Sequence, residues 1–442
     1  MLPNFSLDVL GKKIAFSTLV QYAGKALQLV LSAFALKIIS NFFSQDGYGV
    51  YAAITEYALF FSVVANLGIF GNVVRLMADR PDDGNLFLNA MVLRVITGLF
   101  FFALAILICI FTGNNATFVF GTALFCSALF FDFVTSVCDG MLQANYMMGR
   151  ANIALVCGRL INVGVLILLT RYFTAWHGAA FNSMWQQYFV LGATLLGSFV
   201  TCGLSLLFVA RKIRLSWQTR WLTILKILKV SLPYGIIIIV NNLYFRFIPD
   251  YLAHHFLTDA YFGSFNIYFR ISQVLSLAST FLMFSALPGL TEYIDASRYT
   301  KAKKLFTFLK RLFLVSGTGL VVIGSLVGPW VVSLLTHEKY NIPQLWFLLP
   351  LMLVLAAVSY GYDLVFLTLF AFNEDVWFLK REFLALAIGA VFFGLSFTIT
   401  DLTLQMIFIL SGAIAAESTM VILGMLNIRR LFHVAQNIAQ NE

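Results

Sequence analysis

Residues 86–112 read LFLNAMVLRVITGLFFFALAILICIFT. This run is longer than the roughly 20 apolar residues with which an α-helix crosses the hydrocarbon core of a bilayer. Arg94 is its only charged side chain. A helix on the surface of a soluble core would carry a polar face, and this stretch has none. It therefore predicts a transmembrane helix.

Comparable apolar runs recur along the whole chain of 442 residues. Hydrophobic residues make up 60% of the sequence and charged residues 11%, whereas roughly 25% of a typical soluble domain is charged. This composition excludes a soluble globular protein and leaves connections too short for a separate catalytic domain. We predict an all-α polytopic membrane protein with about 12 transmembrane helices. They are expected over residues 12–38, 48–71, 86–112, 116–139, 151–172, 184–210, 230–250, 261–290, 306–335, 344–371, 380–400 and 404–427.

The charges of the connections predict the orientation of these helices. The net charge of +9 comes mainly from basic residues that would share one side, with clusters in residues 211–229 and 298–311. The opposite side would hold only Arg171 and Lys339. Because basic loops stay in the cytoplasm, both termini are expected there. The excess positive charge is thus interpreted as topology, and no nucleic-acid partner is expected.

The longest polar connection, residues 211–229, lies near the middle of the chain. Its Trp221, Leu222 and Leu225 alternate helically with basic residues, which is typical of an amphipathic helix at the membrane interface. We expect it to join two six-helix bundles. The predicted domains are an N-terminal bundle over 1–210, the linker over 211–229, a C-terminal bundle over 230–428 and a cytoplasmic tail over 429–442.

A weak internal repeat supports the two halves. Residues 45–49 (QDGYG) resemble residues 258–263 (TDAYFG), and each segment is expected in the first outer loop of its half. Transporters built from repeats hold their substrate where the repeats meet. We therefore expect a central cavity between the bundles and a monomeric protein.

Basic side chains lie inside several predicted helices, where a charge costs about 3 kcal/mol and marks a functional site by default. Lys25 lies near the middle of the first helix, on one face with Gln21 and Gln28. If such faces converge, they form a cationic cavity suited to a phosphorylated substrate. The alternative is that each cation pairs with a buried acid or extends to the interface. The candidate substrate-binding residues are Lys25, Arg94, Arg159, Arg246, Arg270, Gln21, Gln28, Asn242, Asn266 and Gln273.

Acidic residues also lie inside predicted helices. Asp363, Glu417 and Glu56 are candidates for coupling transport to protons or sodium ions. Asp132 and Asp139 belong to a polar stripe of the fourth helix. The alternative is that these acids neutralise Lys25 or Arg159, with the exception of Asp363 and Glu417, which have no basic residue nearby in the sequence.

Other chemistry has little support in the sequence. The five cysteines lack the spacing of a zinc site or a disulfide framework, and His254 and His255 have no further ligand cluster near them. No phosphate-binding glycine loop with a Lys-Ser or Lys-Thr ending is present. We expect no metal, no cofactor and no enzymatic activity.

Short motifs at the start of each half resemble a known family. Residues 47–52 (GYGVYA) and 66–75 (NLGIFGNVVR) are similar to the first hairpin of bacterial polysaccharide repeat-unit flippases. These flippases belong to the multidrug/oligosaccharidyl-lipid/polysaccharide (MOP) exporter superfamily. Residues 260–263 (AYFG), 268–273 (YFRISQ) and 286–290 (ALPGL) resemble the corresponding part of the second half.

The resemblance implies a transporter of the bacterial inner membrane that works by alternating access. Its substrate would be an undecaprenyl-diphosphate-linked oligosaccharide, such as an O-antigen repeat unit, moved from the cytoplasmic to the outer leaflet. Contact with polysaccharide polymerase machinery would fit this role. Three alternatives remain: a cation or drug exporter of the same superfamily, a lipid II flippase, and a membrane polysaccharide polymerase. Buried cations disfavour the exporter, and short outer connections disfavour the polymerase.

Overall fold

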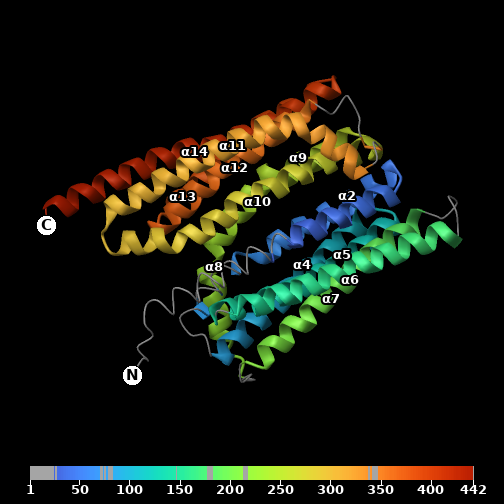
Figure 1. The fold of residues 1–442 in the computed structure, drawn as a ribbon, viewed down its shortest axis with the longest axis horizontal. Helices are drawn as coiled ribbons and strands as arrows, with labels where there is room; N and C mark the ends of the chain where they lie inside the picture. Colours follow the sequence, from blue (N-terminus) through green and yellow to red (C-terminus); the bar gives the residue numbers. More distant parts are fainter. Residues whose placement is uncertain are drawn as a thin grey trace. The chain divides into compact units, whose positions relative to one another are not determined.

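The computed structural model of the protein describes residues 24, 27–69, 73, 76–77, 83–145, 147–176, 183–212, 218–336, 339–340 and 347–441. Helices account for the regular structure of these residues, which contain no strand (Figure 1). The chain divides into two compact units, Met1–Gly235 and Ile236–Glu442.

Unit 1 is a bundle in which α5 packs against α4 and α7, and α7 also packs against α6 (Figure 1). The first part of α8 completes its core, because Ile224 and Ile227 are buried there with residues of α4 and α5. Its helices are Leu27–Phe42, α2 (Gln45–Asn66), α4 (Gly84–Phe111), α5 (Ala116–Ala144), α6 (Met148–Trp176), α7 (Ser183–Ala210) and the start of α8 (Trp221–Asn242).

Unit 2 is a second bundle, in which α12 packs against α10, α11 and α14, and α13 packs against α14. The seventh span is interrupted by one π-helical segment, η2, between α8 and α9. The elements of this unit after α8 are η2 (Leu243–Phe247), α9 (Ile248–Phe256), α10 (Asp259–Asp295), α11 (Tyr299–Thr336), α12 (Leu348–Ala371), α13 (Asp375–Ser396) and α14 (Leu402–Asn441).

The predicted all-helical membrane fold is confirmed. Among the described residues, nine helices are long and apolar enough to cross a membrane. The shorter apolar helix Leu27–Phe42 and the helices α10 and α13 account for the remaining predicted segments.

Capping side chains explain where several helices begin. Ser44 accepts a hydrogen bond from the Gly47 amide at the start of α2, and Asp83 does the same for two amides at the start of α4. The two similar segments noted in the sequence, residues 45–49 and 258–263, both lie at the start of a long helix.

Several helix ends differ from the hydropathy prediction. The polar stretch after residue 290 is helical on both sides of a short turn, because α10 continues to Asp295 and α11 begins at Tyr299. The segment expected as a tail continues α14 as far as Asn441. Hydropathy locates the apolar part of a helix, whereas backbone hydrogen bonds extend the same helix into polar sequence.

Candidate functional site

Arg94 lies on the packed face of α4. The buried residues Ala90, Arg94, Thr97 and Phe102 recur at helical spacing along this face. The Arg94 side chain is 2% exposed, so it neither extends to the interface nor faces lipid. Its surroundings are provided by the rest of unit 1.

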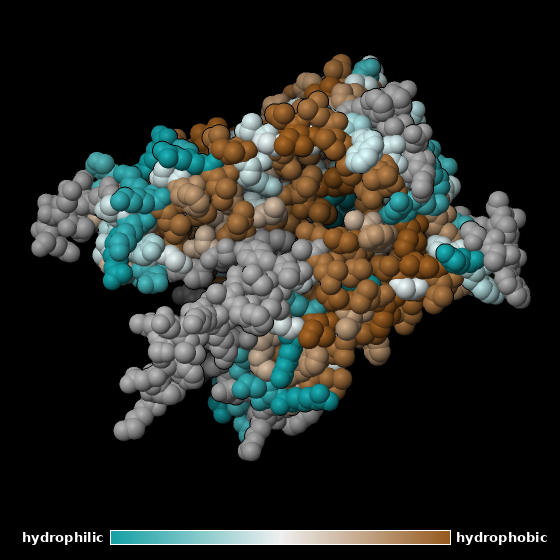
Figure 2. All heavy atoms as spheres, viewed as in Figure 1, coloured by the Kyte–Doolittle hydropathy of each residue, from teal (hydrophilic) through white to brown (hydrophobic). Residues whose placement is uncertain are grey.

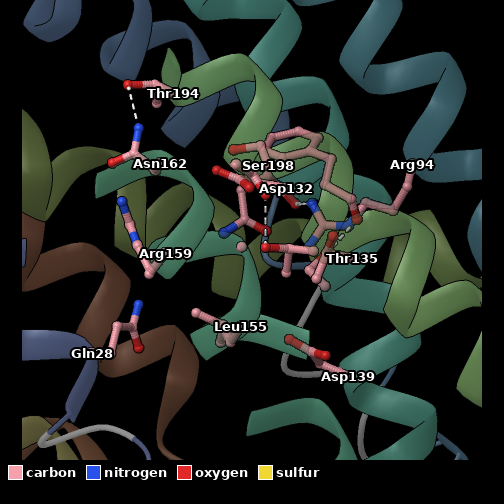
Figure 3. Close-up of a pocket in the computed structure, with 16 residues that line it drawn as sticks. Gln28, Arg94, Asp132, Thr135, Asp139, Leu155, Arg159, Asn162, Thr194 and Ser198 are labelled. Carbon is pink, nitrogen blue, oxygen red and sulfur yellow. Dashed lines mark hydrogen bonds between the residues drawn. The ribbon is translucent and has the colours of Figure 1, made fainter. Parts of the chain in front are cut away.

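Arg94 contributes to a polar cavity of about 360 Å³ inside unit 1 (Figure 3). This volume lies within the range of ligand pockets, roughly 300–1,000 Å³. Residues of α2, α4, α5, α6 and α7 line it, together with Gln28 of the first described helix. The lining comprises Gln28, Asn66, Arg94, Asp132, Phe133, Thr135, Ser136, Asp139, Leu155, Gly158, Arg159, Asn162, Thr194, Gly197, Ser198 and Thr201.

The Arg94 guanidinium has few partners. Its Nη1 donates to the Asn66 carbonyl oxygen at 3.4 Å, and the group lies 4.9 Å from the centre of the Phe133 ring. That carbonyl is accessible because α2 ends there, with Leu67 in a left-handed conformation at φ 44°. Nε is buried without a hydrogen-bond partner among the described residues. Arg94 therefore retains N–H groups that could donate hydrogen bonds to a ligand in the cavity.

The cavity also contains acidic groups, so it is not purely cationic. Asp132 accepts a hydrogen bond from Ser198 and interacts electrostatically with Arg159. In Figure 3, Arg94 and Arg159 lie on opposite sides of Asp132 and Ser198. Asp139 also lines the cavity, and its Oδ1 is buried without a hydrogen-bond partner in the described part of the chain. The interaction of Asp132 with Arg159 is consistent with the alternative that acids neutralise Arg159, which stays a prediction. Both signs of charge face one space.

Hydroxyl groups supply acceptors to the same cavity. Thr135, Ser136 and Thr201 each donate their hydroxyl hydrogen to a carbonyl of their own helix. A hydroxyl that donates in this way keeps its oxygen lone pairs for another donor. The Asn162 amide lies 3.5 Å from the Thr194 hydroxyl (Figure 3). The lining therefore presents both donors and acceptors, which suits a polyhydroxylated ligand.

Two glycines bring α6 and α7 close together beside the cavity. A Cβ atom on Gly158 would overlap the Thr201 side chain and lie 2.5 Å from the Gly197 carbonyl oxygen. A Cβ atom on Gly197 would lie 2.9 Å from the Gly158 carbonyl oxygen. Small residues at these positions allow the two helices to approach, as is common in membrane bundles.

A Gly158→Leu variant is expected to lower the thermal unfolding midpoint, because overpacking costs about 1–3 kcal/mol. Gly164→Leu is the matched control on the same helix, since a Cβ atom at that position would have no other atom within 4 Å. Unfolding followed by intrinsic fluorescence in detergent measures both variants. Equal stability of the two variants would contradict the close approach of α6 and α7.

The structure brings some of the predicted binding residues together and separates others by unit. Arg94, Arg159 and Gln28 line the cavity of unit 1. Lys25 and Gln21 lie outside the described residues. The remaining candidates, Arg246, Arg270, Asn242, Asn266 and Gln273, lie in unit 2.

Three of the candidates in unit 2 have identified local partners, whereas Gln273 Nε2 is buried without a hydrogen-bond partner among the described residues. Arg246 lies in η2, with its guanidinium 5.7 Å from the Phe247 ring centre. Asn266 is buried in α10 and donates to Asp250 at 3.0 Å. Asn242 donates to the Ile238 carbonyl of its own helix at 2.9 Å. Their assignment to one cavity with Arg94 stays a prediction.

Unit 2 contains a buried network of two carboxylates. Tyr244 donates to Glu382 Oε2 at 2.9 Å, and Tyr362 donates to Glu382 Oε1. Asn241 donates to Glu417 Oε2 at 3.1 Å and to the Tyr244 hydroxyl at 2.9 Å. Glu382 and Glu417 are 0% and 1% exposed. These hydrogen bonds come from uncharged donors, so no described cation neutralises the two carboxylates through them.

Asp363 forms a second acidic position in unit 2. Its Oδ2 accepts hydrogen bonds from Ser279 at 2.6 Å and Thr280 at 2.7 Å. It interacts electrostatically with Glu417. The sequence candidates Asp363 and Glu417 therefore lie near one another, whereas Glu56 is buried in α2 of unit 1.

Sequence reasoning missed Glu382. It follows Lys380 and Arg381, and a charged triplet at the predicted start of a helix resembles a surface position. The structure begins α13 earlier, at Asp375, and turns Glu382 onto the buried face with Phe378 and Ala385. The spacing of Phe378, Glu382 and Ala385 is the signal that could have found it.

Comparison with known sequences gives the family. Residues 10–294 match the family model described as polysaccharide biosynthesis protein. The chain belongs to this family, a flippase family of the MOP superfamily. No curated protein sequence is similar enough to match the chain.

Solved structures show that this family member has the two-lobe fold of MATE transporters. An inward-facing multidrug resistance MATE transporter of the MOP superfamily has a TM-score of 0.72 at 14% identity, with 95% of this chain and 99% of that chain covered. An outward-facing multidrug resistance MATE transporter of the MOP superfamily has a TM-score of 0.69 at 15% identity, with 96% of each chain covered. A MOP superfamily transporter from Pyrococcus furiosus, described as having a binding pocket of reversed polarity, matches equally well, with a TM-score of 0.69, 15% identity and 96% of each chain covered. These matches establish a multi-pass transporter fold.

Proposed function

We propose that this family member is a flippase for an undecaprenyl-diphosphate-linked oligosaccharide, such as an O-antigen repeat unit. It would move this lipid from the cytoplasmic to the outer leaflet of the bacterial inner membrane by alternating access. Both termini would be cytoplasmic, and the protein would act as a monomer without catalytic chemistry of its own. Contact with polysaccharide polymerase machinery would follow on the outer side.

The observation that carries the proposal is the buried cavity of unit 1. Arg94 and Arg159 offer charge-assisted donors, which favour phosphate or an acidic sugar. The acceptor oxygens of Asp132, Asp139 and the lining hydroxyls favour sugar hydroxyl groups, because a phosphate could not donate to them. A ligand with both kinds of group fits this lining better than a simple anion.

The carboxylates of unit 2 support coupling to an ion gradient. Two buried carboxylates joined through Tyr244 and Asn241 repel one another, and a proton or a small cation relieves that repulsion. We assign this role to Glu382, Glu417 and Asp363. Glu56 would serve as a further acid in unit 1.

A second candidate function is the export of an organic cation or drug. Asp132 and Asp139 in the cavity favour it, because a cationic ligand needs acidic partners. The buried guanidinium of Arg94 in the same space opposes it.

A reconstitution experiment separates the two functions. Proteoliposomes carry either a fluorescent undecaprenyl-diphosphate oligosaccharide or a fluorescent organic cation, and movement across the bilayer is followed by quencher accessibility. We expect movement of the lipid-linked sugar, lost in an Asp132→Asn/Asp139→Asn variant. Movement of the cation without movement of the sugar would refute the flippase.

A further inference from the structure

The first turns of α11 carry an unusual concentration of positive charge. Six basic residues lie between positions 298 and 311, with no acidic residue among them: Arg298, Lys301, Lys303, Lys304, Lys310 and Arg311. Lys303, Lys304 and Arg311 are exposed. In Figure 2, hydrophilic surface covers the end of unit 2 where α10 stops and α11 begins, next to a hydrophobic flank.

Packing of the opposite face fixes the direction of these side chains. Ala302, Phe306, Leu309 and Phe313 are buried at helical spacing. The Phe306 ring lies 5.8 Å from the Phe432 ring of α14, and the Phe313 ring lies 5.8 Å from the Tyr360 ring of α12. The basic residues of the other face must therefore point away from the bundle.

The exposed face contains a shallow groove. It is lined by residues that recur at helical spacing: Thr300, Lys303, Lys304, Thr307, Phe308 and Arg311. Phe308 lies between the cations and is 62% exposed, so the groove combines positive charge with an exposed aromatic ring.

The same face becomes mainly apolar one turn later, with Thr318 as a small polar side chain within it. Leu314, Val315, Val322 and Leu326 are all more than half exposed. At 1.5 Å per residue, Arg311 and Leu326 lie about 22 Å apart along the helix. An acyl chain spans half of the hydrocarbon core, about 15 Å, so the stripe is long enough to contact one along its length.

We propose that this face of α11 is a binding site for an anionic phospholipid of the leaflet in which the basic turns lie. Lys303, Lys304 and Arg311 would hold the headgroup phosphate, and the stripe from Phe308 to Leu326 would contact an acyl chain. Nucleic acid or an acidic protein would match the charges but not the apolar stripe that continues them. A zwitterionic phospholipid would match the stripe but not the charges.

The experiment measures lipid binding to the purified full-length protein by native mass spectrometry. The lipids are cardiolipin, phosphatidylglycerol and phosphatidylcholine, each titrated into detergent. The test variant is Lys303→Gln/Lys304→Gln/Arg311→Gln. The matched control removes three other exposed charges, Lys226→Gln/Arg429→Gln/Arg430→Gln.

We expect the test variant to bind cardiolipin and phosphatidylglycerol about 100-fold more weakly, since each basic residue at a membrane surface strengthens such binding about fivefold. The control variant should bind as the parent does, and phosphatidylcholine should bind weakly to all three proteins. Should the triple variant fold poorly, the three single variants are each expected to weaken binding about fivefold.

Equal weakening in both triple variants would overturn the site in favour of diffuse surface charge. If the parent protein bound phosphatidylcholine as tightly as the anionic lipids, the proposed contact between the basic residues and the headgroup phosphate would be wrong. Undecaprenyl diphosphate is titrated in parallel. If this lipid bound more tightly than the phospholipids, and through the same three residues, the ligand of the site would be a polyprenyl diphosphate and not a phospholipid. None of these outcomes depends on transport, so they leave the proposed function to its own test.

Discussion

An Arg94→Gln variant is expected to fold and insert like the parent protein but to move a lipid-linked oligosaccharide about 10 to 100 times more slowly. Loss of a charge-assisted hydrogen bond to the substrate costs about 1.5–3 kcal/mol, which sets this range. Stability should be unchanged or higher. Arg94 is buried with one backbone hydrogen bond and one aromatic contact, and removing such a charge relieves its desolvation.

Two further variants make the Arg94 result specific. Arg94→Lys keeps the charge but loses the planar fork, so it should restore part of the rate. Arg150→Gln removes an exposed cation from α6 and should leave transport unchanged. Rates come from the quencher assay, and thermal unfolding in detergent gives stability. If the Arg94→Gln variant transported at the rate of the parent protein, Arg94 would not be part of the substrate site.

A Glu382→Gln variant is expected to lose the response of transport to an imposed ion gradient. The amide cannot bind a proton or balance a cation, so the rate with a gradient should fall to the rate without one. The substitution also disturbs the network, because the side-chain NH₂ cannot accept from Tyr244 or Tyr362. That mismatch should lower stability by about 1–3 kcal/mol.

A second variant separates the loss of coupling from the loss of stability. Tyr362→Phe removes one hydrogen bond to Glu382 but keeps the carboxylate, so it should lower stability while coupling is retained. Glu292→Gln, at an exposed position of α10, is the control that should retain coupling. Transport is compared under imposed proton and sodium gradients. A gradient response that persists in Glu382→Gln would assign coupling to Glu417 and Asp363 alone.

Part of the candidate site could be predicted from the sequence. Arg94, Arg159 and Gln28 were identifiable because a charge or amide inside an apolar run needs a partner or a cavity. The acids Asp132 and Asp139 were also visible as one polar stripe, and the structure places both in one cavity with Arg94 and Arg159. Asn66 could not be found in this way, because its carbonyl becomes available only where α2 ends.

The sequence by itself determined that the protein is a helical membrane protein, because hydropathy acts over each segment independently of its neighbours. It also determined which helices carry ionisable groups. Only the tertiary structure decided which of these groups meet: Arg94 with Phe133, Asp132 with Ser198, and Glu382 with Tyr244. The physical reason is that a helix face acquires partners only through packing. Glu382 is buried by contacts with residues far away in the sequence, whereas Lys380 of the same charged triplet stays exposed.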